Sequence, residues 1–225
     1  GGIIIDVLFA LGPVWVRRKI ILAYHQATDE VIQFINRERG YTRTGAGGKG
    51  PRTKLDLIYA TFLHMTNRKI EPKLHVHLVL PNAGLKEDGT GGTLDSERIL
   101  KGNFKFKIGQ RFRNSLARHF CHQFKEYGLT LDSYEIEHGT AYRVRGVPQG
   151  LCDDYSTRHY DIRARIDGRK LTAKQKQAEV LKSRPAKPDS INLNDLHKEW
   201  AKVAQKHGFD AEVFIEKSRK LHQTQ

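Results

Sequence analysis

The 225-residue sequence predicts an α+β protein with a central antiparallel sheet, packed by helices and followed by a helical C-terminal portion. Two observations lead to this prediction. Apolar runs typical of strands occur before Asp153, and short turn sequences separate several of them. From Asp153 onward, the chain has the pattern of successive helices.

The N-terminal part of the chain predicts a strand, a long helix and a loop. Residues 3–9, IIIDVLF, form a short apolar run that we interpret as a strand. Residues 16–39 repeat apolar side chains at helical spacing and predict an amphipathic helix. The glycine-rich, basic stretch at 41–54, YTRTGAGGKGPRTK, then predicts a mobile loop or hairpin tip.

The middle of the chain predicts an antiparallel hairpin. Residues 55–64 and 74–81 each have the composition of a strand, and the polar stretch MTNRKIEPK connects them. The sequence KEDGTGG predicts a turn, and LDSERIL opens a helix with Asp95 or Ser96 at its N-cap.

Residues 106–127 predict the clearest helix, because an apolar residue recurs at every fourth position. The stretch SYEIEHGTAYRVRG predicts a β-hairpin that turns at His138 and Gly139. Further on, SRPAKPDS reads as a basic, proline-containing linker between helical segments.

The charge balance predicts a polyanionic partner. The chain has 39 Lys and Arg against 25 Asp and Glu, a formal net charge of +14. Nucleic acid is the first candidate, and general solubility is the alternative. A membrane is not expected, because the basic residues are dispersed and no apolar run is long enough to span a bilayer.

The two cysteines and the N-terminus bear on location. Cys121 and Cys152 lack the spacing of a metal site or a disulfide framework, and the sequence shows no signal peptide. We therefore expect a cytoplasmic protein in a reducing compartment.

The most informative stretch is LHVHLVLP at 74–81, where His75 and His77 interrupt an alternating strand. Residues i and i+2 of a strand project to the same face, so the two imidazoles can reach one ion. His64 ends the preceding predicted strand, and antiparallel pairing brings it next to the other two. Three imidazoles with an open coordination position suit a catalytic divalent ion.

Two other interpretations compete with this one. A single HxH pair in a strand is more often a half-exposed strand face than a metal site. A cupin-like metal centre also uses HxH, but that fold demands many short strands, and this chain turns helical instead.

With these residues in place, HMTNRKIEPKLHVHLVLPN resembles the signature of conjugative DNA relaxases of the TrwC/TraI (MobF) type, in the HUH endonuclease superfamily. In that family one histidine precedes an H-hydrophobe-H pair by eleven residues, across a proline-containing turn, and an asparagine follows the strand. The resemblance continues through DGTGGTLDSERI, YRVRGVP, YSTRHYDIRARI and HKEWAKVAQKHGFD. The matching positions are His64, Glu71, Pro72, His75, His77 and Asn82.

The resemblance implies a function. Such relaxases nick one DNA strand at a plasmid transfer origin by tyrosine attack on a phosphodiester, and they remain attached to the 5′ phosphate. A divalent ion, Mg²⁺ or Mn²⁺ with Zn²⁺ as another candidate, would be held by His64, His75 and His77 and would neutralise charge on the phosphate. The expected partners are single-stranded plasmid DNA at a transfer origin and other relaxosome proteins.

The resemblance also bears on Asp6 and on the nucleophile. A family acidic residue lies on an early strand just ahead of a Phe, and Asp6 and Phe9 fit that pattern. Asp6 would orient a ligand histidine or accept the nucleophile's proton. The family's nucleophilic tyrosines lie before that strand, and none of the eight tyrosines here occupies such a position. The nucleophile is therefore unknown, and we expect its segment to lie outside this sequence.

Candidate DNA contacts are basic residues near the histidines and the loop. Arg68 lies between His64 and His75, where the family also carries arginine. The glycine-rich loop adds Lys49, Arg52 and Lys54. For Arg111 and Arg113, on the predicted long helix, we expect ordinary surface charges.

The resulting division is a relaxase catalytic core at 1–167 and a helical extension of the same domain at 168–225. Two alternative functions stay open: a nicking-inactive module that binds single-stranded DNA, and a rolling-circle replication initiator or transposase of the same superfamily.

Overall fold

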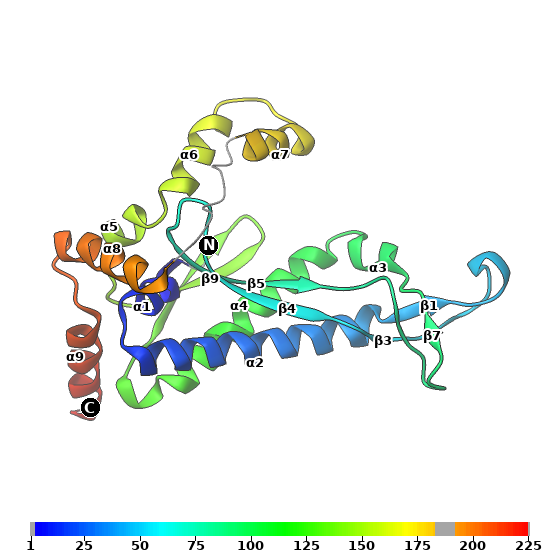
Figure 1. Cartoon of the computed structure of the whole chain (residues 1–225), viewed down its shortest axis with the longest axis horizontal. Coiled ribbons are helices and arrows are strands. Elements are labelled where there is room, and N and C mark those ends of the chain that lie inside the picture. Colours follow the sequence, from blue (N-terminus) through cyan, green and yellow to red (C-terminus); the bar gives the residue numbers. More distant parts are fainter. Residues whose placement is uncertain (1–2, 183–191, 225) are drawn as a thin grey trace.

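The structure is a computed structural model that describes residues 3–182 and 192–224. Figure 1 shows two long helices, α2 and α4, running along the strands, with the C-terminal helices gathered at one end. The helices are α1 (Ile3–Leu11), α2 (Val14–Arg39), α3 (Ser96–Leu100), α4 (Phe104–Gln123), α5 (Gln149–Asp154), α6 (Thr157–Ile166), α7 (Ala173–Lys182), α8 (Leu193–Lys206) and α9 (Ala211–Gln223), with short 3-10 helices η1 (Ala46–Gly48) and η2 (Lys125–Tyr127).

The strands pair antiparallel and confirm the α+β class. Within the described residues they divide among four small sheets, with the orders β1-β2, β3-β6-β7, β4-β5 and β8-β9. The strands are β1 (Tyr41–Arg43), β2 (Arg52–Lys54), β3 (Asp56–Leu57), β4 (Ala60–Thr66), β5 (Pro72–Val79), β6 (Gly84–Leu85), β7 (Gly91–Gly92), β8 (Leu131–Ile136) and β9 (Gly139–Val144).

The N-terminal segment contradicts its prediction. Residues 3–9 belong to helix α1 and not to a strand. The helix packs against α2, α8, β5 and β9, and Val7 and Leu8 are fully buried. A short run that is apolar on every side has no periodicity to separate a buried helix from a buried strand, so only the surrounding structure decides.

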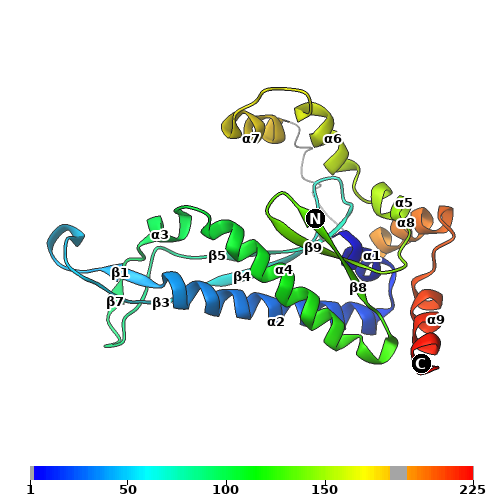
Figure 2. The same cartoon turned by 180° about the vertical axis from the view of Figure 1, so that it is seen from behind.

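The other main elements agree with the sequence. Helices α2 and α4 lie at the predicted positions and pack along each other. The stripe on α4 is buried as expected, since Phe120 and the following Phe124 have no exposed surface. Figure 2 shows the β8–β9 ribbon beside α4, and its turn lies between Ile136 and Gly139 as predicted.

The β4–β5 hairpin rests on the core by one face. Leu74 is 4% exposed, and Leu63 and Val76 pack against the same cluster. Leu78 packs against a second cluster formed around Val31, Ile35 and Phe104. Because side chains alternate across a strand, burial of this face leaves the opposite face of the hairpin open to solvent.

The C-terminal helices pack onto the same core. The indole Nε1 of Trp200 in α8 donates a hydrogen bond to the carbonyl of Ile70, in the turn between β4 and β5, at 3.0 Å. The Tyr155 hydroxyl donates to the carbonyl of Trp200. The predicted linker SRPAKPDS lies outside the described residues, and the boundary at 167/168 stays a prediction. No helix in residues 3–182 or 192–224 has the length and apolar composition of a membrane span.

Candidate metal centre

The register of the β4–β5 hairpin brings the three predicted histidines together. His64 lies directly opposite His75, and Phe62 lies opposite His77. Directly paired residues of an antiparallel hairpin share a face, and His75 and His77 share one by their spacing. All three imidazoles therefore project from the solvent-facing side, away from Leu74.

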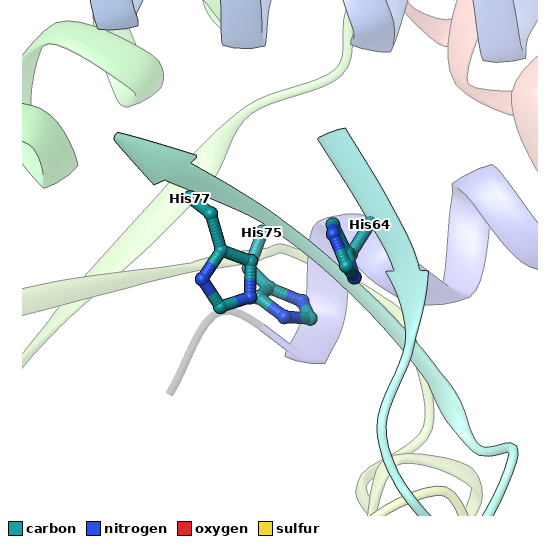
Figure 3. Close-up of side chains that lie close together, drawn as sticks. All are labelled: His64, His75 and His77. Carbon is teal, nitrogen blue, oxygen red and sulfur yellow. The ribbon is translucent and has the colours of Figure 1, made fainter. Parts of the chain in front are cut away.

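The imidazoles are close enough to share one ion. Figure 3 shows the rings of His75 and His77 on β5 with that of His64 beside them on β4. The ring centroids lie 4.5–5.4 Å apart, and one ligand nitrogen from each ring lies within 4.8 Å of the others. Nitrogens bound tetrahedrally to a common ion at about 2.1 Å would lie about 3.4 Å apart, so side-chain rotations would bring the rings together around the ion.

The hydrogen bonding of His75 prepares it as a ligand. Its Nδ1 lies 2.9 Å from the carbonyl oxygen of Lys73. A carbonyl only accepts, so Nδ1 carries the proton and Nε2 keeps a free lone pair. Burial lowers the pKa of His75, and the neighbouring imidazoles of His77 and His64 lower it further, against the raising effect of the bond to Lys73. The neutral, metal-binding form is therefore favoured.

The other two rings are also free to bind. Within the described residues, the ring nitrogens of His64 and His77 have no hydrogen-bond partner, and both side chains are exposed. The cluster contains no carboxylate. Three neutral nitrogen donors with open positions fit a divalent transition-metal ion that keeps room for a substrate oxygen.

Asp6 reaches the histidine strand through the backbone. Its Oδ1 accepts a hydrogen bond from the Leu74 N–H at 3.0 Å, one residue before His75. The side chain is 1% exposed, and Oδ2 has no hydrogen-bond partner among the described residues. Burial raises the pKa of Asp6 to about 8, against lowering by the Leu74 N–H, Lys73 and Tyr24. Asp6 therefore lies beneath the hairpin and accepts a hydrogen bond from the strand backbone, not from an imidazole.

No tyrosine of the described residues stacks on the three imidazoles or hydrogen-bonds to them. Tyr24 is buried and donates its hydroxyl to the carbonyl of Leu74, on the core side of the hairpin. Burial raises the pKa of Tyr155 above the usual range of a phenol. Neither tyrosine is placed to act as the nucleophile, so the identity of the nucleophile stays open.

Comparison with known proteins now decides the family. The family model described as TrwC relaxase matches residues 5–207, which is most of the chain. The chain belongs to the TrwC relaxase family. The three histidines and Asp6 all lie inside the matched range.

Curated relatives support the same assignment. The relaxase-family chain is 28% identical over 204 residues to the multifunctional conjugation protein TraI of Escherichia coli strain K12, and 25% identical over 202 residues to another E. coli TraI. Each match covers 88% of this chain and 11% of the relative. The chain thus spans about a tenth of the length of these relatives.

Solved structures of conjugative relaxase TrwC share the fold. A metal-free complex of TrwC with oriT DNA superposes with a TM-score of 0.77 at 23% identity, covering 94% of this chain and 72% of that one. A copper-bound complex with oriT DNA gives 0.75 at 25% identity, covering 92% and 68%. The α+β arrangement of this relaxase-family chain is therefore that of TrwC.

The predicted DNA contacts of the relaxase-family chain fall into two groups. Arg68 lies in the turn between β4 and β5, half-buried and without an ion-pair or hydrogen-bond partner in the described part of the chain. Lys49 is exposed at the tip of the β1–β2 hairpin. By contrast, Arg52 pairs with Asp95 at 2.9 Å, and Lys54 donates to the carbonyl of Arg37 at 2.6 Å. Contacts with α2 and with the start of α3 occupy these two side chains, which weakens their case as DNA contacts.

The α4 arginines agree with their expectation. Arg113 donates to the carbonyls of Thr140 and His138, which ties α4 to the β8–β9 turn. Arg111 lies over the ring of Phe34. Both are structural or surface charges.

Two features near the metal centre were not predicted from the sequence: the exposure of Phe62 and the contact of Glu71 with α6. Phe62 is 53% exposed on the histidine face, opposite His77. Glu71 is buried beneath the turn and accepts hydrogen bonds from α6. The β4–β5 register could have revealed Phe62, whereas the partner of Glu71 lies 86 residues away and has no local signal.

Proposed function

We propose that the chain is a metal-dependent relaxase domain that cuts and rejoins one DNA strand at a conjugative transfer origin. The single observation that carries the proposal is the exposed cluster of three imidazoles, with ligand nitrogens within 4.8 Å of one another. Family membership supports it, as do the conjugation proteins and the oriT-bound TrwC structures among the relatives.

The proposed reaction is a transesterification. A tyrosine oxygen attacks the scissile phosphorus, the bond from phosphorus to the 3′ oxygen breaks, and a 5′-phosphotyrosyl link forms. Attack by a 3′ hydroxyl reverses the step and rejoins the strand. A divalent ion, when bound, would draw charge from a non-bridging phosphate oxygen. The imidazoles would hold that ion and leave positions open for the phosphate.

Asp6 is proposed as a positioning residue. Its bond to the Leu74 N–H fixes the backbone of β5 one residue before His75, and its burial keeps that bond away from water. Its predicted role as acceptor of the nucleophile's proton stays a prediction.

The donor set bears on which divalent ion we propose. Three imidazole nitrogens suit a transition ion such as Mn²⁺ or Zn²⁺, whereas Mg²⁺ prefers oxygen ligands and holds its waters. Of the ions that the sequence suggested, Mg²⁺ fits this cluster least. The partners we propose are single-stranded transfer-origin DNA and other relaxosome proteins, in the cytoplasm.

A covalent-adduct assay tests the proposal. The protein as its gene encodes it is incubated with a labelled single strand that carries the transfer origin and with Mn²⁺, and adducts are counted on a denaturing gel. We expect an adduct with the parent and with His25→Ala, an exposed histidine on α2 outside the cluster. His75→Ala should form none. Strand binding without any adduct in the parent would instead support the nicking-inactive module.

A further inference from the structure

A small cavity lies beside the metal centre, between the β4–β5 turn and the start of α6. Its volume is about 90 Å³. Figure 1 shows this turn next to the first residues of α6, and the bond from the Thr157 hydroxyl to Glu71 joins the two. The polar groups of the lining come from Asn67, Glu71 and Lys73 on one side and from Arg158 and His159 on the other.

Arg158 brings an unpaired positive charge to this cavity. Its Nη1 is buried and has no hydrogen-bond partner, and no ion pair holds the guanidinium among the described residues. Arg158 as a whole is half-buried, so Nη1 is the donor that is both shielded from water and unsatisfied. A buried donor without a partner is costly, and an anion in the cavity would satisfy it. The backbone of Arg158 is meanwhile fixed, because its N–H donates to both oxygens of Glu71 at 3.2 and 3.4 Å.

Glu71 is not the anion that satisfies Arg158. Its carboxylate accepts from the Thr157 hydroxyl, the Arg158 N–H and the Asn67 amide, which leaves it as the cap of α6. The neighbouring Asp161 pairs with Lys69. Burial and the nearby charges of Arg163 and Lys73 lower the pKa of His159, so its neutral ring still offers one N–H donor. The cavity therefore holds cations and donors in excess of free acceptors.

Lys73 connects the cavity to the metal centre. It precedes His75 by two residues on β5, so the strand period sets the two side chains about 6.7 Å apart along one face. An anion bound in the cavity would therefore lie close to a phosphate bound at the histidines. Successive backbone phosphates of a single strand supply such a pair of anions.

We propose that Arg158 and Lys73 bind a backbone phosphate of the single strand, adjacent to the phosphate at the metal centre. This inference rests on the proposed function and adds a second anchor for the strand. The planar fork of Arg158 can bind two phosphate oxygens, while Lys73 contributes a point charge.

Salt titrations test the assignment. A labelled oligothymidine is titrated in EDTA at several salt concentrations with the parent, Arg158→Gln and Arg165→Gln, which removes an exposed charge from the same helix outside the cavity. Arg158→Gln should bind roughly tenfold more weakly. Its slope of log affinity against log salt should fall by about 0.7. Arg165→Gln should follow the parent, and Arg158→Lys should restore the slope but only part of the affinity.

Three outcomes separate this inference from its rivals. Arg158→Gln should unfold no earlier than the parent on heating, because its guanidinium has no partner to lose; earlier unfolding with unchanged DNA affinity would indicate a structural role and overturn the inference. A parent that binds the strand while Arg158→Gln binds equally well overturns the inference alone. A parent that does not bind the strand overturns the proposed function too.

Inorganic phosphate distinguishes a free anion from the DNA backbone. If phosphate raises the unfolding temperature of the parent but not of Arg158→Gln, and the DNA titrations coincide, the cavity holds a free anion and the strand assignment is wrong. Lys73→Gln combined with Arg158→Gln should lose a different factor in affinity from the product of the single losses, because both side chains contact one phosphate.

Discussion

Two hairpins of this molecule are rich in side chains of the kinds that bind metal or phosphate, and they use these side chains differently. In the β4–β5 hairpin, three histidines converge from one solvent-facing side, and their ligand nitrogens are free. In the β1–β2 hairpin, Arg43 and Arg52 both pair with Asp95, an almost fully buried residue at the start of α3. Figure 1 shows the β1–β2 hairpin at the far end of the molecule from the C-terminal helices.

The difference shows that the number of charged residues and the convergence of unpaired side chains on one point are separate signals of a binding site. Both stretches are rich in groups that bind phosphate or metal, and a count of such residues favours the basic loop. The basic loop, however, uses Arg52 and Lys54 to attach the hairpin to the start of α3 and to the end of α2. The ligand nitrogens of the three histidines instead face one another. Unpaired groups that converge on a point indicate a ligand more strongly than the number of charges does.

The largest expected effect is the loss of metal binding on the histidine hairpin. His75→Ala removes one of the three ligands and should abolish stoichiometric Mn²⁺ or Zn²⁺ binding in calorimetry. His25→Ala, on the surface of α2, should bind as the parent does. If His75→Ala bound the metal as tightly as the parent, the β4–β5 histidines would not be the metal site that distinguishes this hairpin from β1–β2.

The same titration has a predicted pH dependence. Only neutral imidazoles bind the ion, so affinity should weaken below the ordinary imidazole pKa of about 6.5. The lowered pKa of His75 keeps its neutral form to more acidic solution than an ordinary histidine. Metal affinity measured between neutral and mildly acidic pH checks this; an affinity that rises in acid would contradict imidazole ligation.

The next largest effect is on stability and comes from Asp6, the buried carboxyl group beneath the histidine hairpin. The pKa of Asp6 is about 8 in the folded state against 3.8 for the ordinary group, so the folded protein keeps a proton that the unfolded chain releases. Stability should therefore fall as pH rises from about 4 to 8, by a few kcal/mol as an order of magnitude.

Asp6→Asn tests this sign. The amide oxygen still accepts from the Leu74 N–H but does not titrate, so the variant should be more stable than the parent at pH 8 and close to it at pH 4. Denaturant unfolding at both values measures the difference. A parent that gains stability relative to Asp6→Asn between these values would show that the carboxylate is ionised in the folded protein.

A smaller effect compares basic residues of the two hairpins directly. Arg68→Ala, in the β4–β5 turn, should lower the slope of log affinity for single-stranded DNA against log salt by about 0.7. Arg52→Ala should change that slope little, because Asp95 already pairs with the guanidinium. Fluorescence anisotropy at several salt concentrations measures both. Equal slopes for the two variants would place the strand across both hairpins or across neither.

The smallest expected effect concerns the β1–β2 hairpin alone. Burial would raise the pKa of Asp95, but hydrogen bonds and charge from Arg43 and Arg52 outweigh it and lower the pKa. The contribution of this carboxylate to stability is thus present near neutral pH and lost as pH falls through the lowered value. Asp95→Asn should cost about 1 kcal/mol at pH 7, since both arginines are nearly half exposed, and less in acid. An equal cost at both pH values would show that the pairing is not ionic.

The sequence by itself determined the elements whose pattern repeats. Helices α2 and α4 follow from apolar side chains at helical spacing, and the β4–β5 hairpin follows from two strands and a polar turn. The histidine cluster was predictable for the same reason, since strand period and antiparallel pairing fix its geometry between His64 and His77. Sequence periodicity is enough to predict an element when the residues that pair with it are close by in the sequence.

Only the tertiary structure decided the rest. Residues 5–10 of α1 are all buried, and a run that is buried on every side carries no hydrophobic period that separates a helix from a strand. Whether Arg52 faces DNA or Asp95 depends on a partner 43 residues away, and the unpaired guanidinium of Arg158 emerges only when α6 packs against the turn below His75. Charge and burial act through space, so residues far apart along the chain settle which groups are free to bind.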